Sequence, residues 1–200
     1  MNPLNGRLQH VLDEIDERNA VDPRPWLIRG ETGPKELLAG RVAYGWVWVL
    51  ESDPRDEQLI AARGHHLRRW TYPRTDFPDG RAGYLRWRTA AKIAHGAEVG
   101  ALMIENGYSG DEADRASSLI RKERLGTDAM TQTHEDALCL VFIESQFDQT
   151  TDLVGEEHMV EVVAKTLKKM SPGAIELAAG IPVSDQARLI IGAAIARGNA

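Results

Sequence analysis

The chain has 200 residues, of which 42% are hydrophobic and 27% are charged, so it is long enough to bury the core of one ordinary globular domain. We therefore expect a single helical domain over residues 1–200. The net charge of -6 at pH 7 argues against general binding to nucleic acid or to an anionic membrane. No secretory leader pattern opens the chain and no apolar run is long enough to span a bilayer, so we expect a cytoplasmic protein with no membrane partner.

Helical signals follow one another along the whole chain. Apolar residues recur at helical spacing, and Ser, Asp or Pro stand at the starts of several segments. The segments expected to be helical are residues 4–19, 34–48, 53–67, 84–106, 111–124, 131–147, 155–170 and 184–197, with a further helix start at Ser171–Pro172. Because no segment shows alternating apolar and polar residues between turn signals, we predict an all-α fold, a compact bundle of about eight helices joined by short loops.

The segment 71–80 is expected to be a loop, since it contains two prolines and ends at a glycine. Charged residues flank the prolines, so a lid over a binding site is one interpretation of this loop. The other is an ordinary surface connection between two helices.

Two adjacent histidines close the third expected helix. At 100° per residue, His66 borders the apolar face of this helix and His65 falls on the opposite side. We therefore predict that His66 is the inward-facing member of the pair. A satisfied core histidine is the alternative to a functional one.

A stripe of basic residues runs along the fourth expected helix. Tyr84, Arg88, Lys92, His95 and Val99 follow one another at spacings of three and four residues and so share one face. Such a stripe either lines a cleft that binds an anion or forms a solvated basic surface.

One carboxylate falls within the apolar face of the sixth expected helix. Asp136 shares its direction with Leu140, Ile143 and Phe147, and a buried carboxylate is costly unless it is paired, hydrogen-bonded or bound to a metal. Cys139 lies in the same apolar run, where we expect a small buried thiol. The partners considered for Asp136 are His66, His95, Arg69, Arg88 and a metal ion.

Three segments together, residues 61–70, 81–88 and 132–142, resemble an uncharacterised family of roughly two-hundred-residue proteins from bacteria and fungi. This is a domain-of-unknown-function family. The resemblance extends over nearly the whole chain, and it implies no established reaction.

The order of these features is also similar to that of the HD-type metal-dependent phosphohydrolases. Those are all-helical proteins in which a His, an adjacent His–Asp pair and a later Asp bind metal. Here His65–His66 lie at the place of the pair, His95 lies on the following helix, and Asp136 lies where the last Asp helix begins. His66 takes the place of the paired Asp. The expected upstream His is replaced by Lys35, Glu36 and Arg41.

This second resemblance implies an HD-domain-like bundle and a metal-assisted hydrolase of a small phosphorylated or nucleotide-like molecule. The candidate catalytic and metal-binding residues are His66, His95 and Asp136. A divalent ion, Mn, Fe, Zn or Mg, would lower the pKa of a bound water and polarise a phosphoryl oxygen. The candidate substrate-binding cations are Arg69, Arg88 and Lys92, which suit the anionic group.

Two alternatives belong to other classes of protein. In the first, the chain is a non-catalytic binding or regulatory protein for an anionic metabolite, with the cationic pocket but no metal. In the second, it is a helical interaction module whose basic residues pair with acidic neighbours. A small anionic molecule is the expected partner, nucleic acid is not, and self-association is left open.

Overall fold

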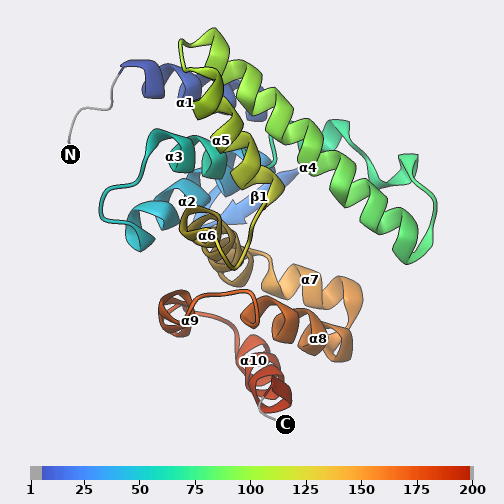
Figure 1. The fold of residues 1–200 in the computed structure, drawn as a ribbon. Coiled ribbons are helices and arrows are strands. Elements are labelled where there is room, and N and C mark those ends of the chain that lie inside the picture. The colour runs from blue at the N-terminus through green and yellow to red at the C-terminus, as the bar shows by residue number, and fades with distance from the viewer. Residues whose placement is uncertain (1–5, 199–200) are drawn as a thin grey trace. The chain divides into compact units, whose positions relative to one another are not determined.

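A computed structural model describes residues 6–198 of the chain as ten α-helices and one short hairpin (Figure 1). The all-helical class predicted from the sequence is confirmed. The described residues divide into two compact units, one ending at His134 and the other beginning at Glu135. None of the described helices has both the length and the apolar character needed to cross a membrane.

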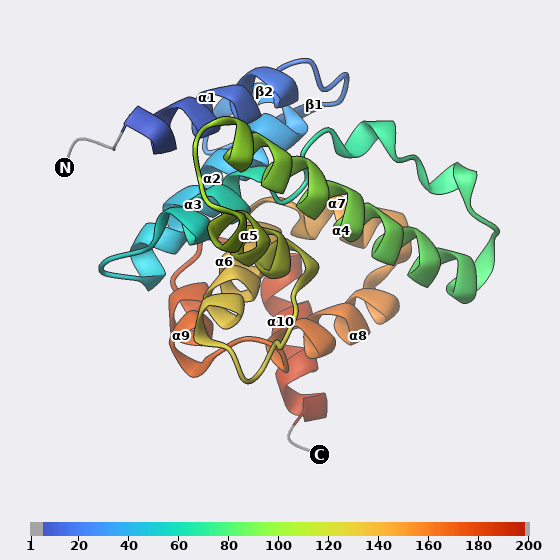
Figure 2. The ribbon, with the colours of Figure 1, turned by 45° about the horizontal axis from the view of Figure 1, so that its top comes forward.

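The first unit contains most of the secondary structure. Its elements are α1 (Gly6–Asn19), β1 (Pro25–Ile28), β2 (Glu31–Pro34), α2 (Lys35–Leu50), α3 (Asp56–Gly64), the 3₁₀ turns η1 (Arg69–Thr71) and η2 (Arg74–Asp76), α4 (Gly80–Glu105), α5 (Gly110–Arg121) and the first turns of α6 (Ala129–Ser145). Helix α4 lies beside α5 in both ribbon views (Figure 2), and α3 contacts α1, α2, α4 and α5. The short helix α3 is therefore the centre of this unit's packing.

A close helix contact fixes the position of α2 against α3. Gly40 lies in the middle of α2, and a Cβ atom built there would lie 2.4 Å from the backbone oxygen of Arg63. Only glycine permits this approach, because any side chain would collide with backbone that cannot move away cheaply. The contact brings the first turn of α2 close to the chain that follows α3.

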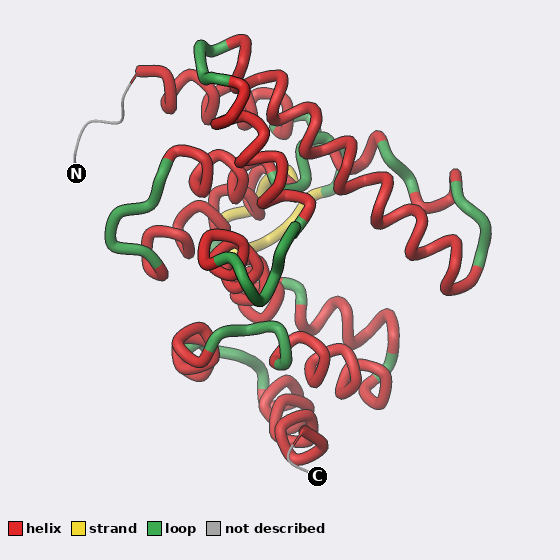
Figure 3. The backbone as a smooth tube through the Cα atoms, viewed as in Figure 1, coloured by secondary structure: helices red, strands yellow, loops and turns green. Residues whose placement is uncertain are grey.

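The hairpin β1–β2 was not predicted from the sequence. Its antiparallel strands pair Pro25 with Pro34 and Ile28 with Glu31 (Figure 3). Each strand has only four residues, which is too short for an alternating pattern to stand out. The turn between the strands has positive φ at Arg29 and Gly30, the backbone conformation of a two-residue type I′ loop.

The second unit has its own apolar core. Its elements are the remainder of α6, α7 (Phe147–Val154), α8 (Glu156–Leu167), α9 (Pro172–Ala179) and α10 (Asp185–Gly198). Helix α8 packs against α7 and α10. The buried residues of this core are Phe147, Met159, Val160, Val163, Ala187, Ile190 and Ala194.

Several helix limits differ from those predicted. The structure has more helices than the eight expected, because Phe147 begins a separate helix, α7. Helix α3 ends at Gly64, before both histidines, and α4 begins at Gly80. The loop between them is tied together by Arg74, whose guanidinium donates hydrogen bonds to the backbone oxygens of Phe77 and Pro78. The HD-like architecture stays a prediction.

Candidate functional site

Four imidazoles form a chain of contacts inside the first unit. The rings of His65 and His66 lie 4.3 Å apart between centroids, those of His65 and His134 lie 5.0 Å apart, and those of His66 and His95 lie 6.0 Å apart. His134 Nε2 and His65 Nδ1 are hydrogen-bonded at 3.1 Å. The cluster thus combines residues from the turn after α3, from α4 and from the start of α6.

A tight turn after α3 places the two adjacent histidines. Gly64 ends the helix where a Cβ atom would lie 2.6 Å from a methyl carbon of Val99 on α4, so glycine is required for this approach. Because the helix stops there, the helical projection of the two rings was wrong. His65 is the more buried residue, at 7% exposure, whereas the His66 side chain is 34% exposed.

The buried carboxylate of Glu36 contacts the partly exposed ring of His66. His66 Nδ1 lies 3.2 Å from Glu36 Oε2, in the first turn of α2, and the Glu36 side chain is 2% exposed. Burial alone would raise the pKa of Glu36, but the adjacent His66 and the guanidinium groups of Arg24 and Arg69 together lower it to about 2. Glu36 is therefore ionised at neutral pH and can only accept a hydrogen bond. Burial lowers the pKa of His66, which favours its neutral form, and the proton of the neutral ring lies on Nδ1. The lone pair of Nε2 remains available as a base or as a metal ligand.

The Glu36 carboxylate is in turn paired with Arg24. Arg24 Nη2 lies 2.8 Å from Glu36 Oε1 and 2.8 Å from Asp22 Oδ2. The backbone N–H of Glu36 donates to the same oxygen of Asp22 at 3.1 Å. Asp22, whose side chain is fully buried, therefore holds both the guanidinium and the backbone next to the Glu36 carboxylate.

His95 is buried, and its ring nitrogens have few hydrogen-bonding partners. It is 1% exposed, and neither ring nitrogen has a hydrogen bond of good geometry within the described residues. Tyr72 packs edge-on against the ring, with the centroids 5.3 Å apart. Burial, followed by the positive charge that His66 carries when protonated and by that of Arg69, lowers the pKa of His95 to about 3, while Glu36 and the backbone of Leu67 oppose this effect. His95 is neutral at physiological pH, with a nitrogen lone pair in a dry environment.

Two guanidinium groups next to the cluster lie on aromatic rings. The guanidinium carbon of Arg69 lies 4.6 Å from the ring centroid of Trp87, and that of Arg88 lies 5.7 Å from the ring of Tyr84. Among the described residues, no carboxylate lies within the 4.0 Å of an ion pair with either group. Burial lowers the pKa of Arg69, and the charges of Arg24 and Arg88 add to this effect, whereas the Glu36 carboxylate opposes it. Two cations that lack an ion-pair partner are suited to an anionic ligand.

The other sequence-predicted residues have contacts of their own. Lys92 is hydrogen-bonded to the backbone oxygen of Arg121 at 3.4 Å. Asp136 is 3% exposed, as predicted, and its carboxylate accepts the backbone N–H of Ser171 at 2.9 Å within the second unit, a partner that we had not considered. Its participation in a metal site with His66 and His95 stays a prediction. Cys139 is buried, as expected.

Sequence reasoning missed the residues that surround His66. Glu36 had been noted only as a replacement for the upstream His of the HD pattern, and it proves to contact the neighbouring ring. His65 had been placed on the opposite side of its helix and His134 had not been singled out, yet both lie in the imidazole chain. Adjacent histidines before a turn are the one local signal for this cluster. Over residues 6–198, no three His, Cys, Asp or Glu side chains meet in a geometry that could hold a metal ion.

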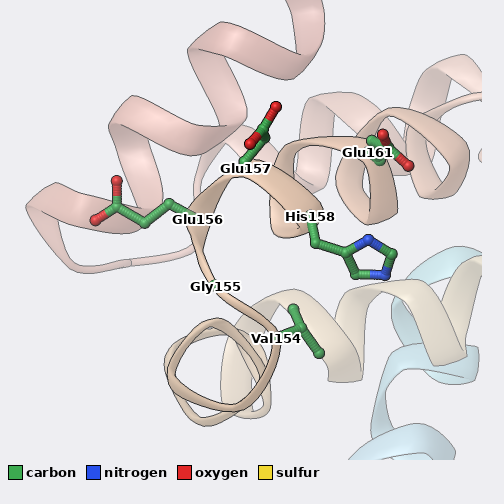
Figure 4. Close-up of a pocket in the computed structure, with 6 residues that line it drawn as sticks. All are labelled: Val154, Gly155, Glu156, Glu157, His158 and Glu161. Atoms are coloured by element: carbon green, nitrogen blue, oxygen red, sulfur yellow. The ribbon is translucent and has the colours of Figure 1, made fainter.

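A separate pocket lies in the second unit, at the junction of α7 and α8 (Figure 4). It has a volume of about 430 Å³ and is lined by Val154, Gly155, Glu156, Glu157, His158 and Glu161. The three carboxylates point in different directions and are solvent-exposed. An acidic lining of this kind repels anions, so the pocket does not suit the ligand expected for the first unit.

The fold and the site together define an all-helical protein in which a cluster of imidazoles lies beside two guanidinium groups that have no ion-pair partner among the described residues. The sequence of residues 9–191 matches the model of a family described as Domain of unknown function (DUF4202). Because the match covers most of the chain, this protein belongs to that family. Comparison with proteins of curated function and with solved structures found no match.

Proposed function

We propose that this protein binds and hydrolyses a small phosphorylated or nucleotide-like molecule at the His66 side of the imidazole cluster. One observation carries the proposal: a neutral imidazole, oriented by an ionised buried carboxylate, lies next to guanidinium groups that have no ion-pair partner among the described residues. Arg69 and Arg88 would bind the phosphoryl oxygens. His66 Nε2 would accept the proton of the attacking water, the task of a general base.

A divalent ion is an additional component that this proposal allows, with two imidazoles as its candidate protein ligands, since no third His, Cys, Asp or Glu among residues 6–198 completes a metal-binding group. His66 Nε2 and His95 are neutral imidazoles, the form that binds metals, and His95 has ring nitrogens that lack good hydrogen bonds. Glu36 would support such a ligand from behind, because metal-bound histidines commonly donate their other N–H to a carboxylate. The ion would acidify a bound water and polarise the phosphoryl group.

The test compares turnover by the full-length protein across a panel of phosphomonoesters and nucleotides, with Mn²⁺ and with chelator. We expect H66Q to lower kcat by about 10²- to 10⁴-fold, the usual contribution of a general base. R69Q and R88Q should each weaken substrate binding about tenfold or more, since a hydrogen bond to a charged group is worth about 1.5–3 kcal/mol. R86Q is the matched control, because Arg86 is an exposed arginine on the same helix. Equal turnover by H66Q and the wild type would overturn the proposal.

A non-catalytic binding protein for an anionic metabolite is the second candidate. The unpaired guanidinium groups favour it independently of any reaction, since they would bind an anion whether or not His66 acts as a base. It predicts that phosphate compounds raise the melting temperature through Arg69 and Arg88 while no turnover occurs. Measured turnover that depends on His66 would exclude it.

A further inference from the structure

The hydrogen-bonded series Asp22–Arg24–Glu36–His66 runs from a fully buried carboxylate to a half-exposed imidazole. The side chain of Asp22 is 0% exposed, that of Glu36 is 2% exposed, and that of His66 is 34% exposed. The distances between consecutive polar atoms are 2.8, 2.8 and 3.2 Å. The two carboxylates of the series are thus buried, whereas the Arg24 and His66 side chains, 40% and 34% exposed, are reached by solvent.

Arg24 does more than neutralise the charge of Glu36, because its hydrogen bonds also fix the orientation of that carboxylate. Its Nε and Nη2 bind the two oxygens of Asp22 at 2.9 and 2.8 Å, so the plane of the guanidinium is fixed. The same Nη2 then donates to Glu36 Oε1, leaving Oε2 directed at the His66 ring. A guanidinium can hold this fork because its donors are coplanar, whereas an ammonium group is a point charge.

We infer that Asp22 and Arg24 are positioning residues, which fix the Glu36 carboxylate so that His66 keeps its proton on Nδ1 and presents Nε2 to the ligand. The inference rests on the proposed function for its purpose, because His66 is the base there. The structural part of the inference is independent of any reaction. It states that Arg24, which contacts His66 only through Glu36, maintains one tautomer of the imidazole.

The two possible tautomers of His66 differ in what they can do. With the proton on Nδ1, the ring has a free lone pair at its Nε2. With the proton on Nε2, the lone pair of Nδ1 would face an ionised carboxylate, which is repulsive. If Glu36 can turn away, this repulsion disappears and both tautomers become populated. Arg24 is therefore expected to control the tautomer without touching the imidazole.

The experiment observes the His66 ring by ¹H–¹⁵N NMR in the full-length protein, at neutral pH and without ligand. The signals are assigned by their loss in H66N. In the wild type we expect one Nδ1–H signal with slow solvent exchange and an unprotonated Nε2. R24M should speed the exchange of this proton about tenfold, the factor that corresponds to about 1.4 kcal/mol, and should produce a mixture of tautomers.

Two further variants keep the test decisive if R24M does not fold. R24K retains the charge but not the planar fork, so its exchange rate should fall between those of the wild type and R24M. D22N leaves Arg24 in place and weakens its anchor, and should act in the same direction. R41M is the matched control, because Arg41 is similarly exposed and donates from both Nε and Nη2 to a carboxylate oxygen of Asp16, with no hydrogen bond to Glu36 or His66.

The outcomes separate this inference from the proposed function. A wild-type tautomer and exchange rate in R24K and D22N, with R41M unchanged, would overturn the inference even if the protein hydrolyses phosphomonoesters. Altered tautomers in these variants without any turnover would support the inference and count against hydrolysis. Comparable changes in R41M would show a general loss of rigidity and would also overturn the inference.

Discussion

Replacement of His95 by leucine is expected to stabilise the protein. The imidazole is 1% exposed and its nitrogens lack good hydrogen bonds, so desolvation of this polar ring costs about 1–3 kcal/mol. Leucine has a similar volume and no polar atom. We expect H95L to raise the free energy of unfolding by about 1–2 kcal/mol near pH 8, after allowance for imperfect packing.

Acidification should enlarge the difference in the free energy of unfolding between H95L and the wild type. The pKa of His95 is about 3 in the folded protein and 6.5 in the unfolded chain, so below pH 6.5 the unfolded state binds more protons and the wild type loses stability. At about pH 5, about 1.5 pH units below that value, the loss is about 2 kcal/mol at about 1.4 kcal/mol per unit. The stability advantage of H95L should therefore grow to about 3–4 kcal/mol at about pH 5.

Urea unfolding, followed by tryptophan fluorescence at about pH 8 and about pH 5, measures both the desolvation cost of His95 and the stability lost on acidification. H95Q separates them, because glutamine keeps an unsatisfied buried polar group but does not titrate. It should give no gain near pH 8 and about 2 kcal/mol near pH 5. If H95L is less stable than the wild type by the same amount at both pH values, then His95 is well bonded and the reasoning is wrong.

Four further substitutions test the packing and one helix cap. G40A should destabilise the protein by about 1–3 kcal/mol, because its Cβ would lie 2.4 Å from the Arg63 oxygen. G45A on the same helix has open space and should stabilise the protein by about 0.5–1 kcal/mol. Thermal unfolding distinguishes the two variants. S171A removes the side-chain cap of α9 and should cost about 1 kcal/mol by urea titration. F147A empties a site in the core of the second unit and should cost about 3–5 kcal/mol, measured in the same way.

Helix starts were the most predictable part of the fold. Ser109 with Glu112 forms a capping box at the start of α5, and Ser171 followed by Pro172 begins α9 as predicted. These signals are local, since a side chain bonds to a backbone N–H two or three residues away. The helical class follows from many such signals and needs no knowledge of tertiary contacts.

The site was less predictable because its contacts are distant in sequence. Glu36 and His66 are separated by 30 residues, and His65 and His134 by 69. The projection of the two adjacent histidines failed because α3 ends at Gly64, where Val99 packs closely against the glycine. A helical wheel cannot anticipate a tertiary contact of that kind. Arg69 and Arg88 could be named as candidate anion-binding residues because basic side chains are visible in the sequence itself. Their role in binding a substrate stays a prediction.

The hairpin between Arg24 and Lys35 is closed at its base. The backbone N–H of Lys35 donates to the oxygen of Arg24, and Asp22 accepts from the backbone of Glu36. The geometry around His66 is thus secured where the strands begin and finish, several residues away from the bend at Arg29 and Gly30. Extra residues inserted at that bend would lengthen a peripheral loop and leave the imidazole's support intact, which makes the bend a suitable place for a tag or a reporter group.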